Sequence, residues 1–372
     1  MSFRANRIIQ KRNGSPKILI VRNDGLGDFI LTLPLIASIK KQIPQARIHV
    51  LIRKAVHSLI SILPDIEGAV IDEGVLLKRD RKKYSKEERK ILFSELLFEI
   101  KAHSFDIAVL PYAESASAAL IRKAGIPVRI GSGRRLFLYN YNVWNFNSRR
   151  KSAHSEFTQN LRYLANLGLR IHYTFPAVSV RTQIVAPKKK PESKIAVLHV
   201  IKRNDTALSW PIRYFATLSE YLIQKKYNII LIGDRDDHNE LSKFKKQLEL
   251  KNEKKIKKDS IKIMTDLNLG SLAEQMSKAS LFVGNSSGPL HLAGLVQIPH
   301  IGLFPQNTVS SPERWRTLKF SPSPRYHREY LLASNYEKRC VRCEKEKCKF
   351  FNCMESIGME RVKSAIQKWE TC

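Results

Sequence analysis

Two short glycine-containing segments carry the residue types that bind anions or move protons. The first reads Asn-Asp-Gly-Leu-Gly-Asp and ends at Asp28. Gly25 and Gly27 match the start of a dinucleotide-binding fingerprint, but Ile30 stands where its third glycine belongs, and no Gly-Lys-Ser/Thr follows to make a P-loop. Asp28 is therefore the informative residue, because a carboxylate in the first turn of a helix serves either as a cap or as a general base.

The second segment, residues 284–288, reads Gly-Asn-Ser-Ser-Gly and precedes a helical pattern. The hydroxyls of Ser286 and Ser287, free backbone N–H groups from Gly288 onward and the positive end of a helix make an anion site that suits phosphate. His291, in the first turn of that helix, is expected to face the same pocket. Plain helix capping accounts for the serine and the following proline as well, and a lone histidine is more often structural.

A cysteine cluster near the end of the chain has metal-ligand residue types but incomplete spacing. Its members are Cys340, Cys343, Cys348 and Cys353. Four thiolates can bind zinc tetrahedrally, yet structural sites usually contain two Cys-x-x-Cys pairs and this cluster has one. Disulfides are rare in a reducing compartment. Two interpretations stay open, a structural zinc staple and reduced, inert thiols.

Alternating buried strands and helices are predicted to position the first segment. Residues 17–22 form a short apolar run typical of a strand buried on both faces, and a helix over 29–42 and a strand over 48–52 complete a βαβ unit. Strands at 105–110 and 127–131 and helices at 115–124 and 156–167 continue the pattern.

A basic linker over 186–193, with two prolines, separates this half from a second one. We expect domains at 1–185 and 186–372, both Rossmann-like with doubly wound parallel sheets. The second half is predicted to have strands at 194–200, 227–233, 281–284 and 299–304 and helices at 212–224, 272–278, 289–296 and 356–369. Ligands bind outside the carboxyl ends of such strands, so the cleft between the domains is the expected site.

Composition and net charge limit the classes of partner that the chain is expected to bind. The chain has 372 residues, is 43% hydrophobic and has a formal net charge of +31. It lacks an apolar run long enough to span a bilayer and a signal-peptide core, which predicts a cytoplasmic protein. The positive charge favours phosphorylated substrates and peripheral docking on the anionic inner face of the cytoplasmic membrane. Nucleic acid is the rival partner, but no recognised binding module is present and we expect none to bind. The oligomeric state stays open.

The two glycine-containing segments together resemble a known family. Residues 18–34 (ILIVRNDGLGDFILTLP) and 283–305 (VGNSSGPLHLAGLVQIPHIGLFP) are similar to the two signatures of glycosyltransferase family 9, the ADP-heptose:lipopolysaccharide heptosyltransferases. The Ser-Trp-Pro at 209–211 and the Leu-Ile-Gly-Asp at 231–234 resemble further landmarks of that family. The resemblance covers the chain from Lys17 to about Phe304 and implies the GT-B fold.

The resemblance also implies a reaction. Members invert the anomeric centre as they move heptose from ADP-heptose to a hydroxyl of the lipopolysaccharide core, with no required cofactor or metal. Asp28 falls on the general base. The loop from Ser286 to His291 falls on the segment that holds the diphosphate and the sugar, and Asp237 falls on a carboxylate near the ribose.

Two departures from the family pattern leave the donor sugar open. Ser286 replaces an aspartate that the family uses to hold the sugar, and Leu208 replaces a basic residue that reaches the phosphates. Lys202 and Arg203 lie just upstream and are expected to supply that charge. A transferase for another nucleotide-sugar, a non-catalytic family member and a basic nucleic-acid-binding protein are the alternatives. The Asp-Arg-Asp at 234–236 is interpreted as a polar loop rather than a metal site.

Overall fold

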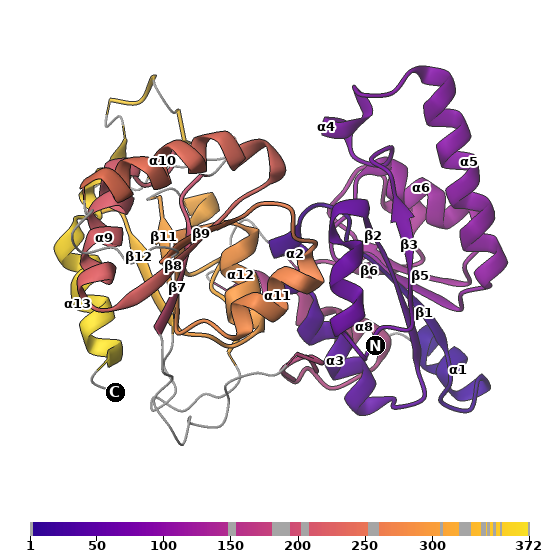
Figure 1. Ribbon diagram of the computed structural model, residues 1–372. Helices are drawn as coiled ribbons and strands as arrows, with labels where there is room; N and C mark the ends of the chain where they lie inside the picture. The colour runs from indigo at the N-terminus through magenta and orange to yellow at the C-terminus, as the bar shows by residue number, and fades with distance from the viewer. Residues whose placement is uncertain are drawn as a thin grey trace. The chain divides into compact units, whose positions relative to one another are not determined.

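Each half of the chain folds around one parallel six-stranded sheet (Figure 1). The computed structural model describes residues 3–147, 154–180, 194–201, 208–251, 260–305, 308–319, 329–335, 340, 343–344, 347–349 and 352–370. The chain divides into two compact units, Met1–Ser179 and Val180–Cys372. The predicted linker at 186–193 lies outside the described residues.

The first sheet has the strand order β3-β2-β1-β4-β5-β6. Its strands are β1 (Lys17–Val21), β2 (Arg47–Arg53), β3 (Gly68–Asp72), β4 (Ile107–Val109), β5 (Val128–Ser132) and β6 (Val143–Asn145). The helices of this unit are α1 (Phe3–Lys11), α2 (Leu26–Ile30), α3 (Leu33–Gln42), α4 (Lys78–Arg81), α5 (Lys86–His103), α6 (Ser115–Lys123), α7 (Glu156–Leu161) and α8 (Tyr163–Leu167), with short 3-10 helices η1 (Lys54–Ile62) and η2 (Leu138–Asn140). Helices α5 and α6 pack their apolar residues on one face of the sheet.

The second sheet has the order β12-β11-β10-β7-β8-β9. Read from the other edge and counted within its unit, this is the order of the first sheet. Its strands are β7 (Lys194–His199), β8 (Tyr227–Ile232), β9 (Ile261–Met264), β10 (Leu281–Asn285), β11 (His300–Phe304) and β12 (Glu329–Ala333). The helices are α9 (Ile212–Gln224), α10 (His238–Lys251), α11 (Leu269–Ser277), α12 (Gly288–Leu295) and α13 (Met359–Glu370), with 3-10 helices η3 (Arg235–Asp237), η4 (Thr308–Ser310) and η7 (Cys353–Ser356). In both sheets the first strand of the unit pairs with the fourth, β1 with β4 and β7 with β10. The chain reverses its winding direction at that pair, which is where ligands bind in such sheets.

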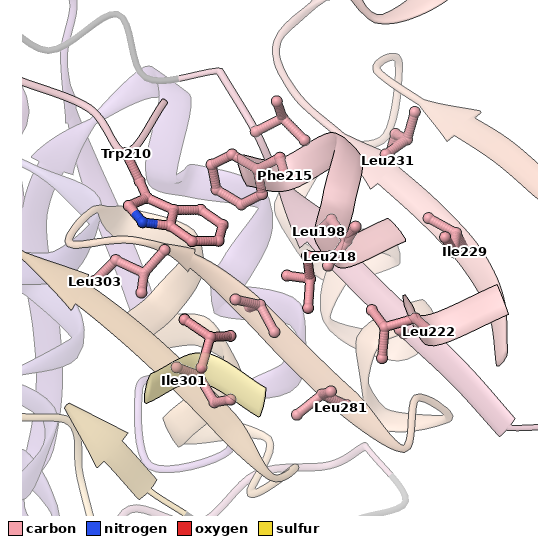
Figure 2. Packing of buried hydrophobic residues seen from close by; sticks show 14 of the residues in the cluster. Leu198, Trp210, Phe215, Leu218, Leu222, Ile229, Leu231, Leu281, Ile301 and Leu303 are labelled. Carbon is pink, nitrogen blue, oxygen red and sulfur yellow. The ribbon is translucent and has the colours of Figure 1, made fainter. Parts of the chain in front are cut away.

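Apolar packing explains why these segments form the layers. In the second unit Trp210 and Phe215 meet edge to face, with ring centroids 4.7 Å apart, above side chains of β7, β10 and β11 (Figure 2). The Trp210 indole donates a hydrogen bond to the Ile357 carbonyl, 2.7 Å away, and this satisfies its polar atom. Burial of an aromatic or aliphatic side chain of this kind contributes about 1.5–3 kcal/mol, so the Trp-Pro segment is held firmly next to the end of β10.

Most predicted strands and helices are present, with shifted ends. The helix at 212–224 is α9 to the residue. The helix expected over 29–42 is two helices, α2 and α3, because Pro34 starts a new helix at its first positions. The helix expected over 156–167 is also divided into two helices, α7 and α8. Among the described residues, no helix is long and apolar enough to cross a bilayer.

Candidate active site

Asp28 lies on α2, just beyond the carboxyl end of β1. Gly25 is the N-cap of α2 and has no side chain, so no N-cap side chain accepts a hydrogen bond from this helix. The capping interpretation of Asp28 is therefore wrong. Its Oδ1 instead accepts a hydrogen bond from the Arg22 guanidinium at 2.6 Å, and the side chain keeps 24% of its surface exposed. A Cβ at Gly25 would lie 3.0 Å from the Asp28 Oδ2, so glycine allows the carboxylate to approach the turn.

Arg22 is the buried centre of a charged cluster. Its side chain is 1% exposed and contacts three carboxylates, at 2.8 Å for Asp24, 2.6 Å for Asp28 and 3.2 Å for Glu156. It also donates to the Asn160 side-chain oxygen at 3.2 Å. Glu156 and Asn160 both belong to α7, so a helix from the far end of this unit holds the guanidinium in place.

A second set of bonds fixes the backbone of the same turn. The Asn160 amide donates to the Leu31 carbonyl at 2.9 Å and to the Thr32 hydroxyl oxygen at 3.1 Å. That hydroxyl donates to the Asp28 carbonyl, also at 2.9 Å. Both the side chain and the backbone of Asp28 are thus tied to α7, and the carboxylate has little freedom to leave its position.

Carboxylates outnumber the cation in this cluster. Burial opposes the charge on Arg22, but Asp24 and Asp28 outweigh that effect and raise the pKa of the guanidinium. Burial also raises the pKa of Asp24 to about 6, and the neighbouring Asp28 adds to the rise while Arg22 opposes it. One cation therefore serves three carboxylates, which leaves the cluster able to accept a proton close to neutral pH.

The edge of the second sheet is uncharged by comparison. Asn285 ends β10 and is fully buried, and its side-chain oxygen accepts a hydrogen bond from the Trp210 backbone N–H at 2.8 Å. Its amide nitrogen has no hydrogen-bond partner among the residues that the structure describes. The Ser287 hydroxyl lies 3.2 Å from the His199 Nδ1 at the end of β7, so the two central strands of the sheet are linked at their carboxyl ends.

The start of α12 has the chemistry of an anion site. Ser287 is its N-cap and makes no side-chain capping bond, and Gly288 and Pro289 open the helix. The first backbone N–H groups of a helix lack partners within the helix and attract negative charge. The partly buried Ser286 and the unpaired amide of Asn285 add further donors at this turn.

His291 lies in the first turn of α12, as predicted, and is almost completely buried. Its ring packs edge-on against Trp315 with centroids 6.3 Å apart. Burial, assisted by His300, lowers its pKa to about 4 against the opposing effect of Glu329. The imidazole is therefore neutral at physiological pH, and its Nδ1 has no hydrogen-bond partner.

The other predicted donor-side residues divide into two groups. Asp237 is buried, and its carboxylate accepts a hydrogen bond from the Asp234 N–H at 2.8 Å in a capping box. Its position is thus explained by the local turn, and a contact with ribose stays a prediction. The Asp-Arg-Asp at 234–236 forms part of that same turn. Lys202 and Arg203 lie outside the described residues.

The cysteine cluster shows thiols and no metal geometry. Cys340, Cys343, Cys348 and Cys353 are all free. No three histidine, cysteine, aspartate or glutamate side chains in the described part of the chain are arranged to hold a metal ion. Burial, followed by the nearby Cys353, raises the pKa of the Cys340 thiol. Cys343 and Cys348 act on Cys340 in the same direction, so the four thiols lie near one another, and both interpretations, inert thiols and a structural zinc staple, stay open.

Comparison with known proteins decides the family. The model of "Glycosyltransferase family 9 (heptosyltransferase)" matches residues 94–353. The chain belongs to glycosyltransferase family 9. This family 9 chain is 27% identical over 322 residues to a putative glycosyltransferase of Haemophilus influenzae, covering 81% of the chain and 86% of the relative. It is 22% identical over 232 residues to lipooligosaccharide heptosyltransferase 2 of Campylobacter jejuni, covering 59% and 67%.

Solved structures confirm the fold of this family 9 glycosyltransferase. The heptosyltransferase WaaC of E. coli with ADP superposes with a TM-score of 0.71 at 16% identity, covering 95% of this chain and 99% of that chain. The match includes both units, so the predicted GT-B class is confirmed. The family match over residues 94–353 makes the chain an enzyme of the glycosyltransferase class.

Sequence patterns missed four residues that the structure places at these two edges. Arg22 and Glu156 surround Asp28, and His199 and Asn285 flank the Ser287 loop. Arg22 follows a buried strand and His199 ends one, and both positions mark the carboxyl edge of a sheet. That position was the available indication. Glu156 had none, because only folding brings α7 to the Asp28 turn.

Proposed function

We propose that this enzyme transfers a sugar, heptose from ADP-heptose, to a hydroxyl of a lipopolysaccharide or lipooligosaccharide core, with inversion at the anomeric carbon and Asp28 as general base. The observation that carries the proposal is the partly exposed Asp28 carboxylate, held by a buried Arg22 that two further carboxylates share. The names of the relatives, a lipooligosaccharide heptosyltransferase and an ADP-bound heptosyltransferase, support the substrates.

In the proposed reaction Asp28 takes the proton of the acceptor hydroxyl as its oxygen attacks the anomeric carbon. The bond from that carbon to the diphosphate oxygen breaks, and the nucleoside diphosphate leaves with the electron pair. Partial positive charge at the start of α12 and the donors of Ser286, Ser287 and Gly288 stabilise the departing charge. The neutral His291 is proposed to bind the donor as a hydrogen-bonding group rather than as a cation. The acceptor-side turn includes Gly25 and Gly27.

Position makes Asp28 suitable as the base. Its carboxylate stays partly exposed while the buried Arg22, which Asp24 and Glu156 also contact, holds it in place. A general base must lie within hydrogen-bond reach of the proton that it takes, so a fixed and accessible carboxylate meets the first requirement.

The sugar itself rests on weaker support than the class of reaction. Ser286 stands where the family uses an aspartate to hold the sugar, so a different ADP- or nucleoside-diphosphate sugar is the second candidate. Asp237, Lys202 and Arg203 stay proposed donor contacts. The acceptor is proposed to be lipid-linked, which requires the enzyme to work at the inner face of the cytoplasmic membrane, and no metal cofactor is proposed.

The test is a screen of nucleotide-sugars by thermal shift, followed by turnover assays with the stabilising donor and a purified core acceptor. Mass spectrometry of the product identifies the sugar added, and NMR of its anomeric proton reports inversion. Stabilisation by ADP-sugars without turnover would instead support a non-catalytic member. Tight, salt-dependent RNA binding with no response to any nucleotide would overturn the proposal.

A further inference from the structure

The stretch between Glu114 and Glu156 has an unusual charge pattern. It contains no acidic residue and eight basic ones, namely Arg122, Lys123, Arg129, Arg134, Arg135, Arg149, Arg150 and Lys151. Other acid-free stretches carry fewer basic residues, for example five over 29–64 and six over 157–191. The stretch after Glu114 is therefore the most basic acid-free one by number of residues, and it includes β5, η2 and the edge strand β6.

Large apolar side chains lie exposed on the same stretch. Leu136 is 99% exposed, Phe146 61% and Trp144 44%, and Tyr139 and Leu138 are exposed beside them. Exposed apolar residues are ordinary when scattered, but a contiguous group marks an interaction surface. We call the group formed by residues 134–146 the Arg134–Phe146 surface.

Contacts show that this surface is continuous. The Trp144 indole N–H donates to the Leu138 carbonyl at 3.2 Å, which joins β6 to η2. The Arg134 guanidinium donates to the Phe146 carbonyl at 2.5 Å. The Arg122 guanidinium of α6 lies 5.6 Å from the centre of the Tyr139 ring. These contacts thus join aromatic side chains and arginines along the edge of the sheet that β6 forms.

The Arg134–Phe146 surface reaches the Asp28 cluster. The Tyr112 ring, which follows β4, has the Arg135 guanidinium 5.9 Å from its centre and the Arg22 guanidinium 5.8 Å from its centre. The loop after β5 and the turn after β1 lie at the same edge of the sheet, because all its strands are parallel. The Arg135 end of this surface therefore lies near the Asp28 cluster.

We propose that the Arg134–Phe146 surface docks on an anionic phospholipid bilayer and so presents Asp28 to an acceptor anchored in that bilayer. Tryptophan, tyrosine and phenylalanine favour the boundary between headgroups and acyl chains, and each nearby arginine gains attraction from anionic lipid. The presentation of Asp28 to an anchored acceptor rests on the proposed function, whereas bilayer binding does not.

Two other occupants fit the surface less well. A second copy of this chain would bring two acid-free arginine groups together, and like charges repel. Single-stranded nucleic acid would use the aromatic rings for stacking but leaves the fully exposed aliphatic Leu136 without a role. A bilayer accounts for the aliphatic, aromatic and basic residues together.

The experiment is sedimentation of the full-length protein with phosphatidylcholine vesicles that contain or lack phosphatidylglycerol. The parent protein is expected to bind only the anionic vesicles and to release at high salt. The Trp144→Ser/Phe146→Ser variant should bind them at least about tenfold more weakly, since two aromatic side chains no longer enter the interface. Arg134→Glu should weaken binding about fivefold or more.

The matched control is Phe98→Ser on α5, which removes a similarly exposed ring (77%) elsewhere in the same unit. It should bind vesicles like the parent, and melting temperatures of all variants verify that they fold. Equal binding of vesicles by the parent and the Trp144→Ser/Phe146→Ser variant would overturn the proposal. So would a variant that changed the oligomeric state or RNA binding and left lipid binding unchanged. Failure of the transferase function would appear separately, as absent turnover with intact lipid binding.

Discussion

The two sheets have the same strand order but opposite kinds of functional edge. The edge of the first sheet is charged, with one buried guanidinium among three carboxylates around Asp28. Around the start of α12 the edge of the second has uncharged groups, namely serine hydroxyls, a buried asparagine amide without a partner among the described residues, an uncharged histidine and a helix start. One topology thus supports two chemistries, because the strands set only where the turns lie and the turn residues set what they do.

The difference suits the two halves of a transfer reaction. An acceptor hydroxyl must lose a proton, which requires a carboxylate with some remaining affinity for protons. A departing diphosphate brings its own negative charge, so its site needs hydrogen-bond donors and a positive dipole. The predictions below test this division, starting with the largest expected effect.

Replacing the proposed base tests the charged edge most directly. Asp28→Asn keeps the shape of the side chain but removes its proton affinity, so turnover should fall by about 10²- to 10⁴-fold. Calorimetric titration with ADP should give the affinity of the parent protein, because the change leaves the second unit intact. An Asp28→Asn enzyme that turns over normally would show that another group accepts the proton.

Removing the buried cation should destabilise the first unit. Arg22→Met leaves buried carboxylates without their partner, so we expect a loss of about 3–5 kcal/mol in unfolding free energy. The matched control is Arg47→Met, which breaks the exposed pair with Glu67 and should leave the unfolding free energy almost unchanged. Chemical denaturation of both variants measures the contrast. Equal losses would mean that the Arg22 cluster contributes no more than a surface ion pair.

The two edges should respond to pH with opposite signs. The pKa of Asp24 is raised in the fold from 3.8 to about 6, so the folded state binds its proton more tightly and stability decreases as pH rises through that window. The pKa of His291 is lowered from 6.5 to about 4, so the unfolded state binds its proton more tightly and stability decreases as pH falls through that window.

Denaturation at several pH values, with Asp24→Asn and His291→Gln as references, separates the two contributions. Each should amount to about 3 kcal/mol at most. The parent should lose stability relative to Asp24→Asn on going to higher pH, and relative to His291→Gln on going to lower pH. The same sign for both differences would contradict the assignment of one charged and one neutral edge.

A hydroxyl deletion tests the neutral edge on a smaller scale. Ser287→Ala removes a donor to the proposed diphosphate and the partner of His199, so ADP should bind about tenfold more weakly. Ser219→Ala is the control, because that hydroxyl is buried in α9 and bonds only to the local Phe215 carbonyl among the interactions described. Unchanged ADP affinity in Ser287→Ala would move the diphosphate away from this turn.

The smallest expected effect is that of a chelator. Because the proposed leaving-group stabilisation comes from backbone dipoles and hydroxyls, turnover in excess EDTA should equal turnover without it. Recovery of lost activity by added Mg²⁺, Mn²⁺ or iron would show that a metal acts at one of the two edges.

Local patterns predicted some elements and missed others for identifiable reasons. The sequence predicts helix α9 to the residue because its apolar positions follow one clear stripe, which starts after Pro211 and ends before Lys225. Helix α5 was missed, since only Leu96 and Ile100 are buried along it and its apolar pattern is diluted by charge. The capping box of Ser85 and Glu88 was the overlooked indication of its start.

By itself the sequence determined the two α/β halves, the Asp28 turn, the serine loop and the family, because each depends on residues close together in the chain. Tertiary structure alone decided the surroundings of those residues. Glu156 reaches Arg22 across 134 residues and His199 reaches Ser287 across 88, because strand order brings distant turns to one edge. Whether Asp28 is a helix cap or a carboxylate poised to take a proton depends on those distant partners, and no local pattern contains them.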